Sequence, residues 1–131
     1  MADASRGVGV DQRKDLSASA VRFYDRITSL WGLSVAQKRV LLGGVAESTY
    51  FKYVKDPDSA KLSRDTLDRI SHIIGIYKTI NILLPRPEAA NAWITKPNAE
   101  FGGKPALDVM LRGGFDDLGF VRRYLDGVRG H

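Results

Sequence analysis

The chain has 131 residues, of which 44% are hydrophobic and 27% are charged. This is enough apolar material for one compact domain or for two small units that share a core, and too short a chain for a large α/β enzyme. Twenty lysines and arginines against fifteen aspartates and glutamates give a net charge of +5, which suits an anionic partner without identifying one. The absence of cysteine excludes disulfides, thiolate zinc sites and thiol catalysis, and it is compatible with a reducing cytoplasm.

The N-terminal segment, residues 1–16, mixes two glycines with six charged side chains and has few sizeable apolar groups. This composition predicts a flexible arm. The segment also lacks an apolar stretch that could form a signal peptide, and the longest apolar runs of the chain are interrupted, for example by Lys78 and Pro85. We therefore expect a cytoplasmic protein with no membrane partner.

Two helices are predicted on either side of a more broken segment. The first begins at Ser17 or Ser19 and ends at Gly32, because its apolar side chains recur at three-residue steps: Val21, Tyr24, Ile27 and Leu30. The second follows Ser63, a suitable N-cap, and carries a wide apolar stripe: Leu67, Ile70, Ile73, Ile74, Tyr77 and Ile80.

The segment between these helices predicts two short helices joined by a tight turn. Ser34 and Gln37 have the spacing of a capping box, which opens the first short helix. Gly43 and Gly44 then favour a turn, since glycine adopts positive φ freely, and residues 45–55 form the second short helix. The pattern is that of a helix-turn-helix.

A helix-turn-helix binds DNA because its second helix enters the major groove while its first helix rests across the phosphate backbone. With Gly44 as the turn glycine, the side chains that would face the groove or meet phosphates are Lys38, Arg39, Ser48, Thr49, Lys52 and Lys55. Two features disfavour this interpretation: Gly43 stands where many such motifs have an apolar residue, and the carboxylate of Glu47 would repel a phosphate. Two short helices joined by glycines also occur in small helical domains that bind no DNA.

Pro85 and Pro87 restrict the backbone to extended conformations and mark a module boundary. They divide the chain into a helical unit over 17–84 and a C-terminal module over 85–131. No segment shows sustained strand alternation, so we expect an almost all-helical fold. In the C-terminal module the sequence predicts a helix over 88–94, an irregular loop over 96–104, a helix with Pro105 as its first residue, and a last helix that starts near Asp116 and Asp117.

Enzymatic interpretations find little support. His72 and His131 are far apart in sequence, and His72 lies within an apolar helix, where a structural role is the simpler explanation. The segment 102–104 has the Gly-Gly-Lys order of a phosphate loop but lacks its first glycine and its Ser/Thr. Asp116 and Asp117 suit the capping of the last helix. We therefore predict neither catalytic residues nor a metal or cofactor.

The C-terminal third contains a spaced motif followed by two glycines and a final helix: Trp93-x4-Asn98-x2-Phe101-Gly102-Gly103-x-Pro105-x-Leu107-Asp108, then Gly113-Gly114 and a helix with Val121 and Leu125. This motif resembles the toxin-binding domain of antitoxins in the Xre/MbcA/ParS family. The preceding helix-turn-helix unit stands where that family places one, so the similarity of module order extends over 17–131. The resemblance implies an all-α fold, with an Xre-like helix-turn-helix unit followed by a small helical toxin-binding module.

The resemblance further implies a bacterial type II antitoxin that catalyses nothing itself. Its partner would be a RES-domain toxin, an NAD-consuming enzyme with an ADP-ribosyltransferase-like fold that either degrades NAD or modifies a protein. The antitoxin would block the toxin's active site with its C-terminal segments, as a homodimer within a heterotetramer or larger complex. It would also repress its own operon by binding operator DNA.

The residues expected to meet the toxin come from the motif and from the basic C-terminal end: Trp93, Asn98, Phe101, Gly103, Pro105, Arg123, Arg129 and His131. The glycine-flanked end, residues 127–131, can extend into a cleft, and the planar guanidinium of Arg129 suits polar recognition there. A frayed terminus and a merely structural Trp93 are the alternatives. A different function also stays open, that of a stand-alone helix-turn-helix regulator whose C-terminal module only dimerises.

Overall fold

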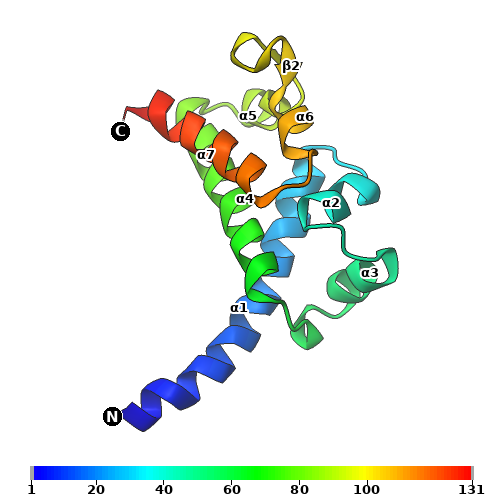
Figure 1. The fold of residues 1–131 in the computed structure, drawn as a ribbon, viewed down its shortest axis with the longest axis vertical. Coiled ribbons are helices and arrows are strands. Elements are labelled where there is room, and N and C mark those ends of the chain that lie inside the picture. The colour runs from blue at the N-terminus through cyan, green and yellow to red at the C-terminus, as the bar shows by residue number, and fades with distance from the viewer. Residues whose placement is uncertain (1, 131) are drawn as a thin grey trace.

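The computed structural model describes the backbone of residues 2–130 and the side chains of residues 16–130. The chain forms, in order, α1 (Ala2–Leu30), α2 (Val35–Leu41), α3 (Glu47–Lys55), a 3-10 turn η1 (Pro57–Ser59), α4 (Arg64–Leu83), α5 (Pro87–Trp93), β1 (Pro97–Asn98), a 3-10 turn η2 (Ala99–Phe101), β2 (Lys104–Pro105), α6 (Ala106–Met110) and α7 (Phe115–Arg129) (Figure 1). The expected all-α fold is confirmed.

The starts of four helices differ from the sequence prediction, namely those of α1, α3, α5 and α6. α1 begins at Ala2, before the expected Ser17 or Ser19, and α3 begins at Glu47 rather than at residue 45. Ala46, in extended conformation, precedes α3 as its N-cap without a side-chain cap. The sequence analysis expected residues 1–16 to form a flexible arm. The side chains of residues 1–15 lie outside the described residues, so this flexibility stays a prediction.

The predicted loop over 96–104 contains a small antiparallel strand pair that the sequence analysis did not predict. Pro97 pairs with Pro105 and Asn98 pairs with Lys104. Pro105 is consequently an N-cap in extended conformation, with ψ of 152°, and α6 begins at Ala106. Two strands of two residues each are too short to produce a visible alternation of apolar and polar side chains.

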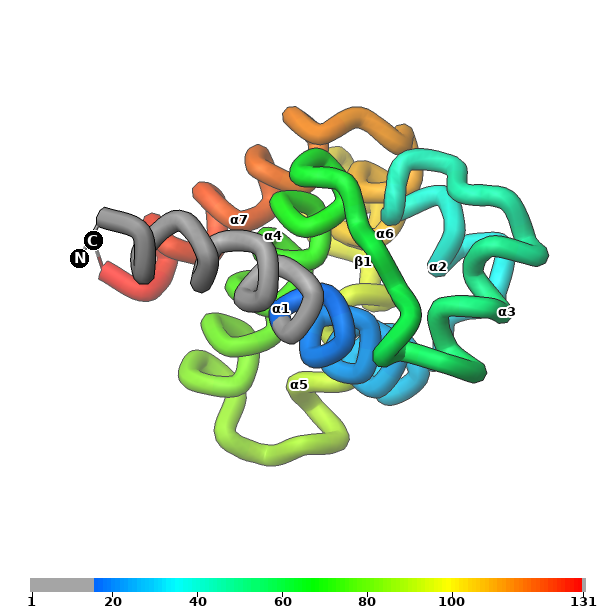
Figure 2. Tube along the Cα trace, turned by 90° about the horizontal axis from the view of Figure 1, so that it is seen from below, coloured from blue at the N-terminus to red at the C-terminus, as the bar shows by residue number. Residues whose placement is uncertain are grey.

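One apolar core joins the two predicted units. α4 packs against α1 on one side and against α7 on the other, and seen from below, α2 and α3 lie on the opposite side of α1 from α7 (Figure 2). Side chains of both units belong to the same buried cluster, including Tyr24, Leu41, Ile70, Ile73, Ile80, Met110, Leu118, Val121 and Leu125. Burying each large aliphatic side chain contributes about 1.5–3 kcal/mol, so each unit stabilises the other.

Candidate functional site

The predicted helix-turn-helix is present. The backbone N–H of Gln37 donates to Ser34 Oγ at 3.1 Å, and the N–H of Ser34 donates to Gln37 Oε1 at 2.9 Å, so the expected capping box opens α2. Gly43 and Gly44 have φ of 95° and 88°, values that L side chains adopt only at a cost. The turn extends to Ala46 because α3 starts late.

α3 exposes a polar face beside two core contacts. Tyr50 is buried, and Tyr53 is half-buried against the core. The opposite face is open to solvent and carries Ser48, Phe51, Lys52 and Lys55, while Thr49 lies half-buried at its edge. Four of the predicted DNA-contacting side chains, those on α3, are therefore accessible on or beside one helical face.

Lys38 corrects the sequence-based assignment. It was expected to meet phosphate, but it is only 8% exposed. Its Nζ donates to Ser29 Oγ at 2.7 Å and pairs with Asp25 Oδ1 at 3.3 Å. The side chain thus fastens α2 to α1, and a buried ammonium held in this way is unavailable to DNA. Its partners precede it by 13 and 9 residues, so no local pattern reveals them.

The carboxylate of Asp25 also positions α3. The Tyr50 hydroxyl donates to Asp25 Oδ1 at 2.7 Å, while the Tyr24 hydroxyl donates to the carbonyl of Lys38 at 2.6 Å. Burial, followed by the hydrogen bond to Asp25, raises the pKa of Tyr50 far above its ordinary value. Tyr50 therefore remains a protonated donor, and this network sets the angle at which α3 is presented.

Arg39 has a partly structural place. It is half-buried, and its Nε donates to the carbonyl oxygen of Val45 at 2.9 Å. The bond closes the segment between α2 and α3. Arg39 therefore braces the turn, a role that the sequence analysis did not predict.

In the C-terminal module, the motif residues build a tight hairpin. Asn98 Oδ1 accepts a hydrogen bond from the N–H of Glu100 at 2.9 Å, and the N–H of Gly103 donates to the carbonyl oxygen of Asn98 at 2.9 Å. Gly102 and Gly103 have φ of 68° and 83°, which favours glycine at both positions. The motif residues Asn98 and Gly103 thus shape the backbone that carries Phe101.

Phe101 packs on α7. Its ring centroid lies 5.2 Å from that of Tyr124 and 6.1 Å from that of Phe120. We call these three residues the aromatic patch. Phe120 is 49% exposed, so the patch is not closed over by the described chain. The sequence analysis missed Phe120 and Tyr124, although two aromatic residues four apart that lie off the buried face of α7 provide a signal.

The apolar surface continues along α7. Val128, one helical turn beyond Tyr124, is exposed, so Phe120, Tyr124 and Val128 follow one another at four-residue steps. Trp93, at the end of α5, is half-buried and packs against the core. The structural role weighed for Trp93 is therefore present, while part of its ring stays accessible.

The C-terminal end is more helical than predicted. α7 continues through Gly127 to Arg129, and only Gly130, with φ of 104°, ends it. The expected extended tail over 127–131 is thus wrong for residues 127–129, and His131 lies outside the described residues. Arg123 and Arg129 are both exposed on α7.

The His72 side chain projects from α4 and packs against α7. Its ring centroid lies 4.9 Å from that of Phe115, and its Nδ1 lies 3.3 Å from Arg122 Nη1. Burial, followed by the positive charge of Arg122, lowers the pKa of His72. The Arg122 guanidinium covers Gly75, where a Cβ would come within 2.6 Å of it. This environment agrees with the structural role predicted for His72.

Over the described part of the chain, no group of three or more His, Cys, Asp or Glu side chains gathers where it could bind a metal ion. None of the described helices combines the length and the apolar character needed to span a membrane.

Comparisons with known proteins identify both modules. Residues 12–75 match the antitoxin Xre-like helix-turn-helix domain, and residues 81–130 match the antitoxin Xre/MbcA/ParS C-terminal toxin-binding domain. The chain belongs to the Xre/MbcA/ParS antitoxin family. The uncharacterized protein y4oB of Sinorhizobium fredii strain NBRC 101917 / NGR234 is 44% identical over 105 residues, which cover 80% of each chain.

The family implies a role for each of the two domains. This antitoxin is a binding and regulatory protein rather than an enzyme, and its two domains imply a toxin partner and DNA binding. The aromatic patch lies within the toxin-binding domain, and the exposed face of α3 lies within the helix-turn-helix domain. The two matched segments are separated by residues 76–80, inside α4.

Proposed function

We propose that this antitoxin neutralises an NAD-consuming RES-domain toxin by covering its active site, and that it represses its own operon through α3. The observation that carries the proposal is the aromatic patch on the toxin-binding domain, in which Phe120 is exposed and Phe101 and Tyr124 are half-buried. Exposed aromatic side chains that pack against one another are typical anchors of protein interfaces.

The toxin would contact the patch and the end of α7 together. Phe101, Phe120 and Tyr124 supply the apolar contact, and Arg123 and Arg129 supply positive charge on the same helix. Because α7 stays helical to Arg129, the blocking element would include the last turn of this helix. Arginine suits this position because its planar guanidinium can donate to several acceptors at once.

Operator binding would use α3, with Ser48, Thr49, Lys52 and Lys55 towards the DNA. A homodimer would place two such helices in successive major grooves. The contact between the two protomers of this homodimer would lie on α1. Three exposed apolar side chains recur there every seven residues: Leu16, Phe23 and Leu30. This spacing keeps them on one face of the helix, which suits pairing with the same face of a second copy.

The test is growth rescue in cells that express the neighbouring open reading frame, with the NAD level measured in parallel. We expect the full chain to restore growth and NAD, and the chain ending at Asp126 to fail. Rescue by both chains would move inhibition to the aromatic patch alone. If the neighbouring protein is not toxic, the proposal fails in favour of a stand-alone regulator with a dimerising C-terminal module.

A further inference from the structure

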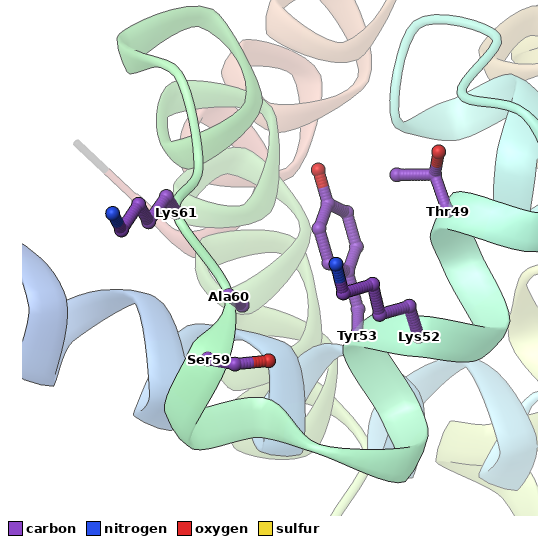
Figure 3. Close-up of a pocket in the computed structure, with 6 residues that line it drawn as sticks. All are labelled: Thr49, Lys52, Tyr53, Ser59, Ala60 and Lys61. Atoms are coloured by element: carbon purple, nitrogen blue, oxygen red, sulfur yellow. The ribbon is translucent and has the colours of Figure 1, made fainter.

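A cavity of about 630 Å³ opens between α3 and the segment that leads from η1 into α4. Thr49, Lys52 and Tyr53 line it from α3, and Ser59, Ala60 and Lys61 line it from the opposite wall (Figure 3). In the close-up, Lys52 lies beside the Tyr53 ring and the Ser59 hydroxyl points towards α3, while Lys61 extends from the far rim with its ammonium directed away from α3. The sequence analysis assigned no binding role to Tyr53, Ser59 or Lys61.

The cavity has the chemistry of an anion site. Its lining holds two ammonium groups and three hydroxyl groups, and none of its six lining residues is acidic. Within residues 16–130, neither Lys52 nor Lys61 forms an ion pair. The neighbouring carboxylate of Asp58 is already paired with Arg22 at 2.9 Å. The lining thus contributes two lysines that form no ion pair within the described residues, one from each wall of the cavity.

Two of the three hydroxyl groups complement the lysines. The third, Ser59 Oγ, already donates to the carbonyl oxygen of Asp56 at 2.9 Å, so its proton is not available to an anion. The hydroxyls of Thr49 and Tyr53 make no hydrogen bond with the described side chains or backbone, so they are available as donors. A phosphate oxygen accepts hydrogen bonds from lysines and hydroxyls alike. The lining thus fits a phosphate group.

The position of the cavity indicates where such a phosphate comes from. Thr49, Lys52 and Tyr53 are spaced i, i+3 and i+4, so they share one flank of α3, and Lys52 connects that flank with the exposed face. A helix in the major groove has a sugar-phosphate strand along each edge. Glu47, whose carboxylate would repel phosphate, does not line this cavity.

We propose that the cavity receives a backbone phosphate of duplex DNA while α3 occupies the major groove. Lys52 and Lys61 contact the phosphate from opposite walls, and Thr49 donates to it. The long, flexible side chain of Lys61 closes over the phosphate from the rim. This inference rests on the proposed DNA binding and adds to it a contact outside the helix-turn-helix.

The experiment compares Lys61→Gln with a matched control, Lys78→Gln, which removes an exposed lysine of α4 that does not line the cavity. Affinity is measured against salt concentration for two labelled duplexes, one from upstream of the coding sequence and one of scrambled sequence. Each phosphate contact contributes about 0.9 to the slope of log affinity against log salt. We expect Lys61→Gln to reduce the slope by about that amount for each bound protomer, on both duplexes, with an affinity loss of about five- to tenfold per protomer at 0.1 M salt. Lys78→Gln should change neither.

A second variant, Thr49→Val, separates charge from hydrogen bonding. It should weaken binding without changing the salt slope, because a hydroxyl carries no charge. Melting curves of all three variants should match that of the unmodified protein, which shows that the fold is intact.

Three results would overturn the inference, and they are distinguishable. If the unmodified protein binds the duplexes and Lys61→Gln keeps its slope, the cavity is not a phosphate contact although the proposed function stands. If the unmodified protein binds neither duplex, DNA binding itself fails. If inorganic phosphate binds with an affinity that Lys61→Gln removes, while the slope on DNA stays unchanged, the cavity takes a free anion instead.

Discussion

The two surfaces of this antitoxin differ in chemistry and in how they are held in place. The exposed face of α3 is mostly polar and carries two lysines, and a partly buried polar network around Asp25 holds it in place. The aromatic patch is apolar, and a tight hairpin and α7 fix it. A charged surface recognises nucleic acid in a salt-dependent way, whereas an aromatic surface recognises protein mainly by burial. One small core therefore supports two surfaces of different chemistry.

Arg69 of α4 links the two domains that carry these surfaces. This side chain is 8% exposed. Its Nη1 donates to the carbonyl oxygen of Gly113, before α7, at 3.1 Å, and to that of Leu41, at the end of α2, at 3.5 Å. Its Nε donates to Asp65 at 3.0 Å. Arg69 thus connects the helix-turn-helix with the toxin-binding domain.

The largest expected effect comes from the shared core. Ile73→Ala should destabilise the protein by about 2–5 kcal/mol, because Ile73 is fully buried and its loss leaves a cavity. Trp31 and Trp93 lie in different units, so single-tryptophan variants, Trp31→Phe and Trp93→Phe, report unfolding of each. We expect the two urea transitions to coincide and to shift together. Separate transitions would mean that the two surfaces rest on independent cores.

The next effect tests the link through Arg69. Gly43→Ala should cost more stability than Gly44→Ala. Both replacements incur about 1–2 kcal/mol for a positive φ, but only the Cβ at position 43 would approach Arg69, at 3.2 Å from its Nε. Thermal melts measure the difference. Equal losses of stability in the two variants would show that the Arg69 side chain moves aside without cost.

A smaller effect distinguishes Lys38 from Lys52, which were both predicted from the sequence to contact DNA. Lys52→Ala should reduce the salt slope of DNA binding by about 0.9 for each bound protomer and leave stability unchanged, because Lys52 is exposed. Lys38→Met should do the reverse, with a loss of about 1–3 kcal/mol of stability as Asp25 and Ser29 lose a partner. Paired salt titrations and melts measure both. A reduced slope for Lys38→Met would return this residue to the DNA interface.

The smallest effect is a pH dependence at the contact between α4 and α7. Because the pKa of His72 is lowered in the folded state, the unfolded chain binds the proton more readily. The contribution of His72 to stability is therefore fully present above pH 6.5, the ordinary pKa of histidine, and it is lost as the pH falls below that value. His72→Gln should show a slightly flatter stability profile than the unmodified protein between about pH 5 and pH 7.5. A steeper profile for the variant than for the unmodified protein would contradict a lowered pKa of His72.

Local signals in the sequence predicted the fold well. The capping box of Ser34 and Gln37, and the cap by Ser63 that accepts from the N–H of Thr66 at 3.1 Å, both involve residues three apart. Gly43 and Gly44 likewise have the positive φ expected of a turn. Interactions of this kind depend on neighbouring residues and are visible before the chain is folded.

Long-range packing could not be predicted in the same way. The partners of Lys38 lie on another helix, and Phe101 meets Phe120 and Tyr124 only after the hairpin folds towards α7. The motif around Phe101 pointed to the right module, but its residues Asn98 and Gly103 shape the backbone. The side chains that extend the surface come from α7, outside the motif.

The most direct test of two separate surfaces compares two phenylalanines of nearly equal exposure, Phe120 at 49% and Phe51 at 51%. Each is replaced by alanine, and toxin neutralisation is measured by growth rescue with the same neighbouring open reading frame. We expect Phe120→Ala to lose neutralisation, with toxin affinity about 30-fold weaker, and Phe51→Ala to neutralise fully. Full neutralisation by Phe120→Ala, or equal loss in both variants, would contradict the assignment of the toxin contact to the aromatic patch.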